Sequence, residues 1–411
     1  MNMLRFISLK EAWDVLRSVS APSPRKKLIP VEHCAGRISA EDICSDIDVP
    51  GHDIAVFDGY AVLAEDVFSA SPSNPILLRL TKSSSISPGE ARAICVGDIL
   101  PSGANAVVPK EFVKEHDSFI EVFRRVTPYA YVARRGEDIR RGGVLVKRGE
   151  LIDPFRQALL MRGLIEEVAV YEKVNIGLIV IGDELTRDMN QVREGKVLDV
   201  TSSIVSSILE PYAHVKDYGI IPDDIKEIEN VLSRSAEEND LVVTLGGTSM
   251  GPKDYTVRAV RSIGDVLFHG VSIMPGRPAA VGKVYGKLVF VFSGLPVAAY
   301  NELKLLLEPF LLRRVYGSST RPIPIKARAT TRIPSRPGVI ETVRVRLMIG
   351  DSELLIVPLR SRGSGILSSL ALADGVVVVP EELEGYEKGE VLNVFRIGDP
   401  WGVVYVQEDI S

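Results

Sequence analysis

A glycine-rich turn after a short apolar stretch is the part of this sequence best suited to chemistry. Residues 241–245 are strand-forming, and Gly246 and Gly247 follow at once, ahead of Thr248 and Ser249. A parallel strand that ends in glycines exposes backbone N–H groups at a sheet edge, which is where open α/β sheets bind phosphorylated ligands. The stretch therefore predicts a cradle for phosphate.

Two other predicted strands end in residues that could share this cradle. Strand 176–181 runs into Glu184, and strand 288–292 runs into Ser293 and Pro296. Because the carboxyl ends of parallel strands lie on one edge of a sheet, carboxylates, hydroxyls and backbone amides should converge there. A carboxylate beside a phosphate cradle is the arrangement that Mg²⁺ needs.

The acidic residues near this edge also have a purely structural interpretation. Asp254 stands where helix 255–263 should begin and could be its N-cap. Asp223 or Asp224 could in the same way cap helix 225–235. The acidic turn after the first strand could simply be solvated. Only the combination of these residues on one edge favours a functional site.

Two features elsewhere allow two interpretations each. Asp58 and Gly59 could form a tight turn, or Asp58 could be a carboxylate that one domain delivers into a cleft formed with another. The basic run at 134–141 could bind an anion, although Glu137 and Asp138 within it favour a solvated surface.

Composition and charge narrow the class of protein. The chain has 411 residues, of which 45% are hydrophobic and 25% charged, so we expect more than one globular domain. The formal net charge of −5 gives no reason to expect nucleic-acid binding. Three widely spaced cysteines indicate neither a zinc site nor a disulfide framework. Without an apolar leader or a long apolar run, we expect a cytoplasmic protein with no membrane contact.

The order of predicted elements indicates the fold class. Strands and helices alternate from residue 174 to 316, which predicts βαβ units and a parallel sheet with helices on both faces. The long final helix of this region is predicted over 296–313, with proline in its first turn. Residues 49–130 and 317–411 instead hold short apolar runs broken by glycine and proline, which is typical of small β modules.

Seven short blocks follow one another along the chain in a recognisable order. They are Pro50-Gly51 through Asp58-Gly59-Tyr60-Ala61, residues 100–108, residues 135–139, Gly182-Asp183-Glu184-Leu185, residues 246–251 with Asp254-Tyr255, Pro275-Gly276-Arg277-Pro278, and Gly363-Ser364-Gly365. Together they resemble the molybdopterin molybdenumtransferase family, which includes MoeA and the C-terminal E domain of gephyrin. The resemblance extends over essentially the whole chain.

The resemblance implies a multidomain α/β + β fold with four domains. We expect an elongated linking domain over 1–48 plus 131–173, and a small β-rich domain over 49–130 that carries the Asp-Gly-Tyr-Ala motif. A central doubly wound parallel-type α/β domain of the molybdopterin-binding kind should span 174–316. A C-terminal β-barrel-like domain should span 317–411.

The resemblance also implies a function. Family members are homodimers that take adenylylated molybdopterin, accept molybdate or tungstate, and release AMP with the help of Mg²⁺. A molybdopterin adenylyltransferase would be a further partner. The active site should lie between the α/β domain and the Asp-Gly-Tyr-Ala domain of the other subunit. Matching positions give as catalytic residues Asp58, Glu184 and Asp254; as metal ligands Glu184, Asp254 and Asp223; and as cofactor-binding residues Gly246, Gly247, Thr248, Ser249, Asp223, Pro275, Arg277, Ser293 and Pro296.

The chain departs from the family pattern where the oxyanion should bind. Met274 stands in place of a lysine, although Arg277 keeps the charge of a second one. A further lysine position is Gly270, a common threonine is Val96, and the Gly-Asn-Pro segment after Pro296 is shortened. Each change lowers polarity near the expected anion site, so the cationic side of the cleft looks incomplete.

These departures leave two functional hypotheses. The first is an active metal-insertion enzyme, which the retained carboxylates favour. The second is a diverged paralogue that binds a pterin or nucleotide, or serves as a dimeric scaffold, without efficient turnover. A hydrolase of pyridine-nucleotide-derived substrates, which would share the α/β domain, is disfavoured because it would not carry the blocks at 58–60 and 135–138.

Overall fold

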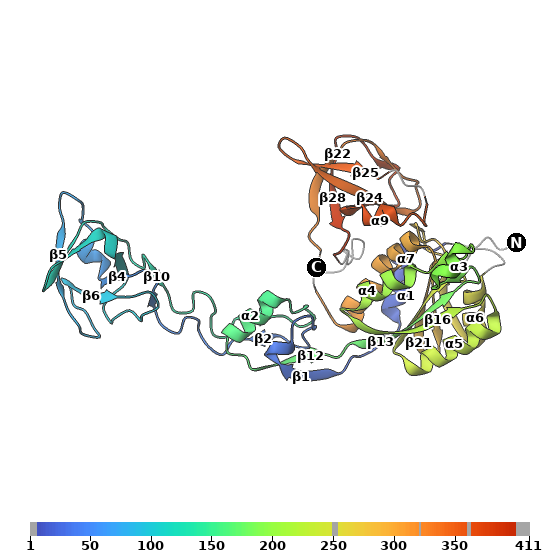
Figure 1. Ribbon diagram of the computed structural model, residues 1–411, viewed down its shortest axis with the longest axis horizontal. Coiled ribbons are helices and arrows are strands. Elements are labelled where there is room, and N and C mark those ends of the chain that lie inside the picture. Colours follow the sequence, from blue (N-terminus) through green and yellow to red (C-terminus); the bar gives the residue numbers. More distant parts are fainter. Residues whose placement is uncertain (1–5, 249–253, 320–321, 360–362, 400–411) are drawn as a thin grey trace. The chain divides into compact units, whose positions relative to one another are not determined.

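The computed structural model describes residues 6–248, 254–319, 322–359 and 363–399 (Figure 1). It divides into two compact units. The first comprises residues 1–27, 148–151 and 170–411, and the second comprises residues 28–147 and 152–169. No helix in the ranges given above is long and apolar enough to cross a membrane. The expected four-domain division stays a prediction.

The first unit contains a six-stranded sheet in the order β16-β13-β17-β21-β20-β18. Four of its strands are parallel, and β20 and β18 complete the sheet in antiparallel pairing. The strands are β13 (Val174–Ile181), β16 (Ala213–Ile221), β17 (Leu241–Gly246), β18 (Gly264–His269), β20 (Ala280–Val284) and β21 (Lys287–Phe292). The predicted parallel-type α/β domain is confirmed, with a mixed sheet.

Helices cover both faces of this sheet (Figure 1). They pack well because the central strands are mostly apolar, as is typical of strands buried on both faces, and all of β17 is buried. One core joins Ile179 and Val242 of the sheet to Ile228 and Val257 of two helices. The helices are α1 (Leu9–Ser18), α3 (Met189–Arg193), α4 (Thr201–Leu209), α5 (Ile225–Glu238), α6 (Tyr255–Ile263), α7 (Pro296–Glu302) and α8 (Glu308–Phe310).

Two details of this region differ from expectation. The hairpin of β20 and β21 and the edge strand β18 extend the sheet, whereas the sequence reasoning assigned no strand between 264 and 284. That segment is broken by glycines and prolines, which hide its short strands. The helix predicted over 296–313 begins at Pro296 as expected, then passes through two π-helical stretches, Leu303–Leu307 and Leu311–Val315.

A small barrel follows in the same unit. Its strands run in the order β24-β25-β22-β28-β26, and β26 pairs back onto β24 to close it. Strand β19 joins the outer edge of β24 in parallel. The elements are β19 (Ile273–Met274), β22 (Ile325–Ala329), β23 (Ile333–Pro334), β24 (Ile340–Ile349), β25 (Leu354–Pro358), α9 (Ser368–Ala371), β26 (Gly375–Val379), β27 (Gly385–Tyr386) and β28 (Val391–Arg396). The predicted C-terminal β module is confirmed.

The second unit contains its own six-stranded sheet, in the order β7-β4-β6-β5-β9-β8. Alternating apolar residues of these strands form its core, including Tyr60, Leu78 and Val108. The elements are β2 (Ile43–Cys44), β3 (Ile54–Ala55), β4 (Gly59–Val62), β5 (Ile76–Leu80), β6 (Glu90–Ile94), β7 (Ala106–Pro109), β8 (Val113–Glu115), β9 (Phe119–Val122), β10 (Val132–Ala133), β11 (Val144–Val146) and α2 (Pro154–Arg162). The Asp-Gly-Tyr-Ala motif thus leads into a central strand.

Candidate active site

The carboxyl ends of the parallel strands are level with one another, as the sequence predicts. Ile181, the last residue of β13, pairs with Gly246 at the end of β17, and Leu245 pairs with Phe292 at the end of β21. On the other side, Ile181 also pairs with Ile221 at the end of β16. All four strands therefore deliver the residues that follow them to a single rim.

The glycine pair after β17 is required by the backbone. Gly246 and Gly247 both have a positive φ, of +95° and +60°. A β-carbon on Gly246 would lie 2.2 Å from the carbonyl oxygen of Ile181, and one on Gly247 would lie 2.3 Å from Oγ1 of Thr256. Only glycine can make this turn without a clash, because a side chain at either position would meet the neighbouring strand or helix α6.

An acidic pocket of about 710 Å³ opens at this rim. Several of the predicted site residues line this pocket: the glycine turn with Thr248, two carboxylates and the first residue of α7. These are Glu184, Asp223, Gly246, Gly247, Thr248 and Pro296. Ser249, a further predicted residue, lies outside the described residues. The structure therefore brings together six of the residues that the sequence singled out.

The structure separates the two neighbouring aspartates after β16. Asp224 is the N-cap of α5, because its Oδ1 accepts hydrogen bonds from the backbone N–H groups of Lys226 and Glu227 at 2.9 and 3.1 Å. Asp223 instead lines the pocket, and its own N–H donates to Oδ1 of Asp183 at 3.2 Å. The capping role thus falls to Asp224, which removes the structural interpretation of Asp223 as that cap.

Asp254 stands at the N-cap position of α6, but its side chain makes no capping hydrogen bond with that helix. Its Oδ2 lies 3.7 Å from Nδ1 of His269, at the end of β18, and both side chains are largely buried. The pKa of His269 is lowered, because the effect of burial outweighs that of the nearby Asp254 carboxylate, which raises it. Asp254 is not among the described residues that line the acidic pocket. Its catalytic and metal-binding roles stay predictions.

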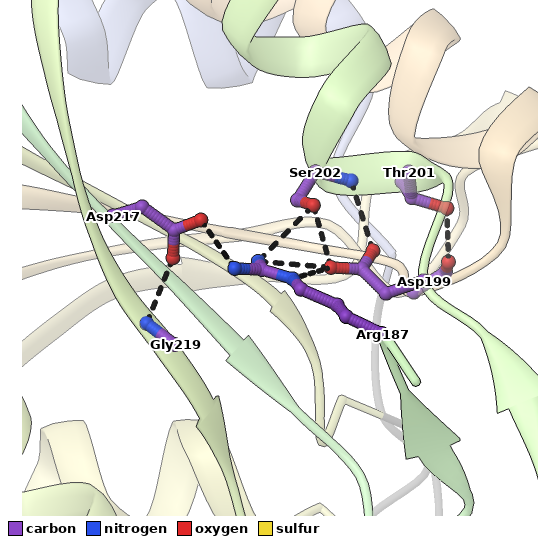
Figure 2. A network of polar contacts seen from close by, with 7 residues as sticks. Arg187, Asp199, Thr201, Ser202, Asp217 and Gly219 are labelled. Carbon is purple, nitrogen blue, oxygen red and sulfur yellow. Dashed lines mark hydrogen bonds and ion pairs between the residues drawn. The ribbon is translucent and has the colours of Figure 1, made fainter. Parts of the chain in front are cut away.

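Arg187 forms a network of polar contacts (Figure 2) that includes Asp199, one of the residues lining the acidic pocket. Arg187 places its guanidinium between Asp217 and Asp199, with contacts of 2.7 and 3.0 Å. Burial lowers the pKa of Arg187, but the two carboxylates outweigh it and raise the pKa overall. Asp199 also accepts the N–H of Ser202 at 3.1 Å, while Thr201 donates to the carbonyl of Gly294 at 2.8 Å. The N-cap residue of α4 is Val200, and the carboxylate of Asp199 just before it binds the N–H of Ser202 in the first turn.

The network engages one of the three acidic residues that line the pocket. Asp199 lines the pocket, but its carboxylate is engaged by Arg187 and Ser202. Glu184 and Asp223 are the other two carboxylates that line the pocket. Mg²⁺ commonly takes only one or two protein carboxylates, together with phosphate oxygens and water. In the described part of the chain no three acidic, histidine or cysteine side chains cluster tightly enough to hold a metal alone. The pair therefore fits Mg²⁺ that a bound phosphate helps to hold.

A second, basic pocket of about 720 Å³ adjoins the first. Both pockets are lined by Thr248, Gly294 and Leu295. Three further predicted residues, Pro275, Arg277 and Ser293, line this second pocket, and so does Met274. The remaining charged residues of its lining come from the barrel: Arg336, Glu341 and Arg344. The expectation of an incomplete cationic side therefore needs a correction, because three arginines face a single glutamate.

The arginines differ in how they are held. Arg344 is buried, and it donates from Nε to Oγ of Ser369 at 3.2 Å and from Nη1 to the carbonyl of Thr342 at 3.3 Å. Burial lowers the pKa of Arg344, but an arginine stays charged at any physiological pH. Arg277 lies over the ring of Phe6, and its Nε is buried with no hydrogen-bond partner among the described residues. An anion in the pocket would supply that partner.

Arg336 and Arg344 are the functional candidates that sequence reasoning missed. Both lie more than fifty residues beyond Arg277 in the chain, on or beside strand β24, which the sequence presents as a short β segment of a separate module. The parallel pairing of β19 with β24 joins that strand to the loop that carries Arg277. No local pattern signals this pairing. The block at 363–365 was the available signal, since Gly363 and Ser364 line the same pocket.

Asp58 belongs to the second unit and is held within it. Its Oδ1 accepts the N–H of Val96 at 2.8 Å, and its carbonyl accepts the N–H of Lys110 at 3.1 Å. The side chain is exposed, as is that of Val96. The hydrogen bond from Val96 holds the side chain of Asp58 in place. The role of Asp58 in a cleft between subunits stays a prediction.

Models of protein families match the chain in three places. The matches are "MoeA N-terminal region (domain I and II)" over residues 7–162, "Probable molybdopterin binding domain" over residues 177–313, and "MoeA C-terminal region (domain IV)" over residues 326–397. They follow one another in order, and they cover the α/β region, the barrel and nearly all of the second unit.

Individual proteins are similar over nearly the full length. A Methanocaldococcus jannaschii protein named "Putative molybdopterin biosynthesis protein" is 38% identical over 94% of this chain and 96% of its own. The molybdopterin molybdenumtransferase of Bacillus subtilis is 28% identical over 92% of each chain. The crystal structure of a molybdopterin biosynthesis MoeA protein from Pyrococcus horikoshii OT3 superimposes with a TM-score of 0.77, at 30% identity, over 95% of this chain and 100% of that one.

Proposed function

Because the chain belongs to the MoeA family of molybdenum cofactor biosynthesis proteins, we propose that it inserts molybdate or tungstate into adenylylated molybdopterin and releases AMP. One observation carries the proposal. Two pockets of opposite charge meet at the carboxyl rim of the sheet and share Thr248, Gly294 and Leu295. A substrate with a pyrophosphate, next to an oxyanion, needs such a pair of neighbouring sites.

The acidic pocket suits the pyrophosphate. Backbone N–H groups of the glycine turn would bind phosphate oxygens, and Glu184 and Asp223 would hold Mg²⁺ against them. When bound, Mg²⁺ would offset the negative charge that builds up on the departing AMP. Water adds to the phosphorus atom of the molybdopterin phosphate, the phosphoanhydride bond breaks, AMP leaves with the bridging oxygen, and the proton of the water passes to solvent.

The basic pocket suits the oxyanion. Arg277 and Arg344 would neutralise its charge, and the hydroxyl of Ser293 would donate a hydrogen bond to it. Thr248 donates to the carbonyl of Pro278 at 3.2 Å, which ties the glycine turn to the loop of Arg277. That bond would keep the two bound groups side by side, so that metal entry and AMP release take place in a fixed geometry.

The remaining expectations extend the proposal. The protein would act as a homodimer, with Asp58 of one subunit completing the site of the other, and it would receive its substrate from a molybdopterin adenylyltransferase. The alternative, a non-catalytic paralogue, drew its support from the loss of family lysines. Arg336 and Arg344 weaken that support, because they restore positive charge beside Met274.

The test is an AMP-release assay. Purified protein is incubated with adenylylated molybdopterin and Mg²⁺, with molybdate or tungstate added in separate reactions, and AMP is measured. We expect AMP to appear with at least one oxyanion and to depend on Mg²⁺. Tight substrate binding without AMP release with either oxyanion would contradict the proposal and favour the scaffold.

A further inference from the structure

A fully buried carboxyl group lies directly beneath the basic pocket. Glu302, the last residue of α7, has no exposed surface. Its Oε2 accepts the backbone N–H of Ser293 at 2.7 Å, and its Oε1 lies 2.7 Å from the hydroxyl oxygen of the same serine. Ser293 in turn lines the pocket. Both oxygens of Glu302 are thus directed at one pocket residue.

Glu302 also supports the loop that carries Arg277. A β-carbon on Gly276 would lie 2.8 Å from Cγ and 3.3 Å from Oε1 of Glu302, so the loop backbone rests against the carboxyl group. The preceding helix residue, Asn301, donates from Nδ2 to the carbonyl of Pro275 at 3.1 Å. The end of α7 therefore holds both walls of the pocket, at Ser293 and at residues 275–277.

The hydroxyl of Ser293 can serve an anion in only one of two arrangements. If Glu302 is ionised, both of its oxygens accept, so the serine hydroxyl must donate downward to Oε1 and has no proton left for the pocket. If Glu302 carries a proton on Oε1, that proton is donated to the serine oxygen. The serine hydroxyl is then free to donate its own proton to a ligand in the pocket.

From this geometry we infer that Glu302 is a positioning residue, which must be neutral for Ser293 to donate a hydrogen bond to an oxyanion in the basic pocket. The inference rests on the proposed oxyanion site and assigns it a proton-dependent control. Ionisation would release one proton to solvent, withdraw the serine donor and place a negative charge under the anion. Each of these changes weakens anion binding.

The environment of Glu302 keeps it neutral near physiological pH. Burial raises the pKa of Glu302 to about 8, and this effect outweighs the two hydrogen bonds from Ser293, which lower the pKa. The charged groups that face the pocket are Arg277, Arg336, Glu341 and Arg344, and the arginines do not titrate in this range.

Other titratable groups on the same helical segment are separate from the pocket. Burial raises the pKa of Glu308 as well, but this side chain pairs with the buried Lys304 at 2.9 Å, and neither residue lines the pocket. Burial also raises the pKa of Tyr300 well above its usual value. Replacing Glu302 alone therefore separates its titration from that of Glu308.

The sign of the pH dependence follows directly. The folded-state pKa is raised, so Glu302 is neutral below about pH 8 and ionises above it. Anion affinity should be constant at lower pH and should fall by up to about tenfold per pH unit above the pKa of Glu302. Binding at a pH about one unit above this pKa should also take up close to one proton, because the anion favours the neutral carboxyl group.

The experiment measures tungstate binding to the full-length protein by calorimetry between about pH 6.5 and pH 9.5, the range that brackets this pKa. Sulfate serves as a second dianionic probe, and buffers of different ionisation enthalpy report the proton uptake. Glu302→Gln should bind tungstate as the wild type does at pH 6.5, because the amide donates to Ser293 as the neutral acid does, and this affinity should persist at pH 9.5. Glu237→Gln, an exposed change on α5, should keep the wild-type profile.

Two results would overturn the inference: a wild-type affinity that does not change with pH, or a Glu302→Gln variant that keeps the wild-type fall. Ser293→Ala gives an independent test, since it should weaken binding at pH 6.5 and reduce the pH dependence. The assay contains no pterin. The two experiments can therefore fail separately. If the AMP-release assay fails but tungstate binding shows the expected pH profile, only the proposed function is contradicted. If AMP is released but tungstate binding does not depend on pH, only the role of Glu302 is contradicted.

Discussion

The two pockets at the sheet rim differ in charge and in the origin of their residues. The acidic pocket takes Glu184 and Asp223 from turns that directly follow strands of one sheet. The basic pocket combines a loop of that sheet with arginines from the barrel. Residues placed by one sheet follow from the strand pattern, whereas residues placed by tertiary pairing do not. The difference in charge also suggests that one pocket binds a cation and the other binds an anion.

The largest expected effect concerns the carboxylates of the acidic pocket. Asp223→Asn should lower the rate of AMP release by about 100-fold or more, because it removes a charge that holds Mg²⁺ against the pyrophosphate. Tungstate binding should change little. Steady-state kinetics over a range of Mg²⁺ concentrations would measure both the loss and any partial rescue at high Mg²⁺.

The neighbouring residue is a matched control for this variant. Asp224→Asn keeps the size of the side chain and leaves a good N-cap, so its stability and rate should stay close to those of the wild type. Asp224→Ala should cost about 1 kcal/mol of stability, again with a near-normal rate. Equal rate losses in Asp223→Asn and Asp224→Asn would mean that Asp223 acts only through the fold.

Asp254 tests whether the acidic machinery extends beyond the pocket. If it helps to hold the metal, Asp254→Ala should reduce Mg²⁺-dependent turnover by about 100-fold. Because the buried carboxylate lies beside His269, the melting temperature should fall as well, so turnover is compared at a temperature at which the variant remains folded. Unchanged AMP release would remove Asp254 from the catalytic set.

On the basic side, Arg277→Gln should weaken oxyanion binding by about 10- to 100-fold, the usual cost of losing a hydrogen bond from a charged group. Mg²⁺ dependence should be unaffected, which is the reverse of the result expected for Asp223→Asn. Calorimetry with tungstate would measure the affinity. An Arg277→Gln variant that binds tungstate normally would remove this side chain from the anion site.

The smallest effect is expected at Met274, which lines the basic pocket between residues that already provide charge. Met274→Lys should lower the molybdate concentration needed for half-maximal AMP release by about two- to fivefold, since a partly exposed ion pair is worth under about 1 kcal/mol. Met274→Gln, uncharged and of similar size, provides the control. No difference between the two variants would show that position 274 does not face the oxyanion.

Much of the α/β region could be predicted because its signals are local. Continuous apolar strands, helix caps and a glycine pair with positive φ each reflect the conformation of a few adjacent residues, and these placed Glu184 and Gly246 correctly. Sequence alone could not choose between Asp223 and Asp224, because both are chemically suitable caps. Only the path of the backbone decides which one lies at the helix start.

The basic pocket could not be predicted for a different reason. The departures at Met274 and Gly270 were visible in the sequence, but the arginines that offset them come from a strand whose partner is set by long-range pairing. Glu302 was equally hidden. A carboxylate in an otherwise apolar helix is expected at the surface, and its burial beneath Ser293 follows only from the packed structure.

The most direct test of the two-pocket account is a crystal structure of the protein soaked with tungstate, pyrophosphate and Mn²⁺, with anomalous scattering used to locate each metal. Mn²⁺ stands in for Mg²⁺ because it prefers the same oxygen ligands. We expect the tungsten peak in the basic pocket, within contact of Arg277 and Ser293, and the manganese peak beside Glu184 and Asp223. Tungsten in the acidic pocket, or manganese bound away from both carboxylates, would contradict the account.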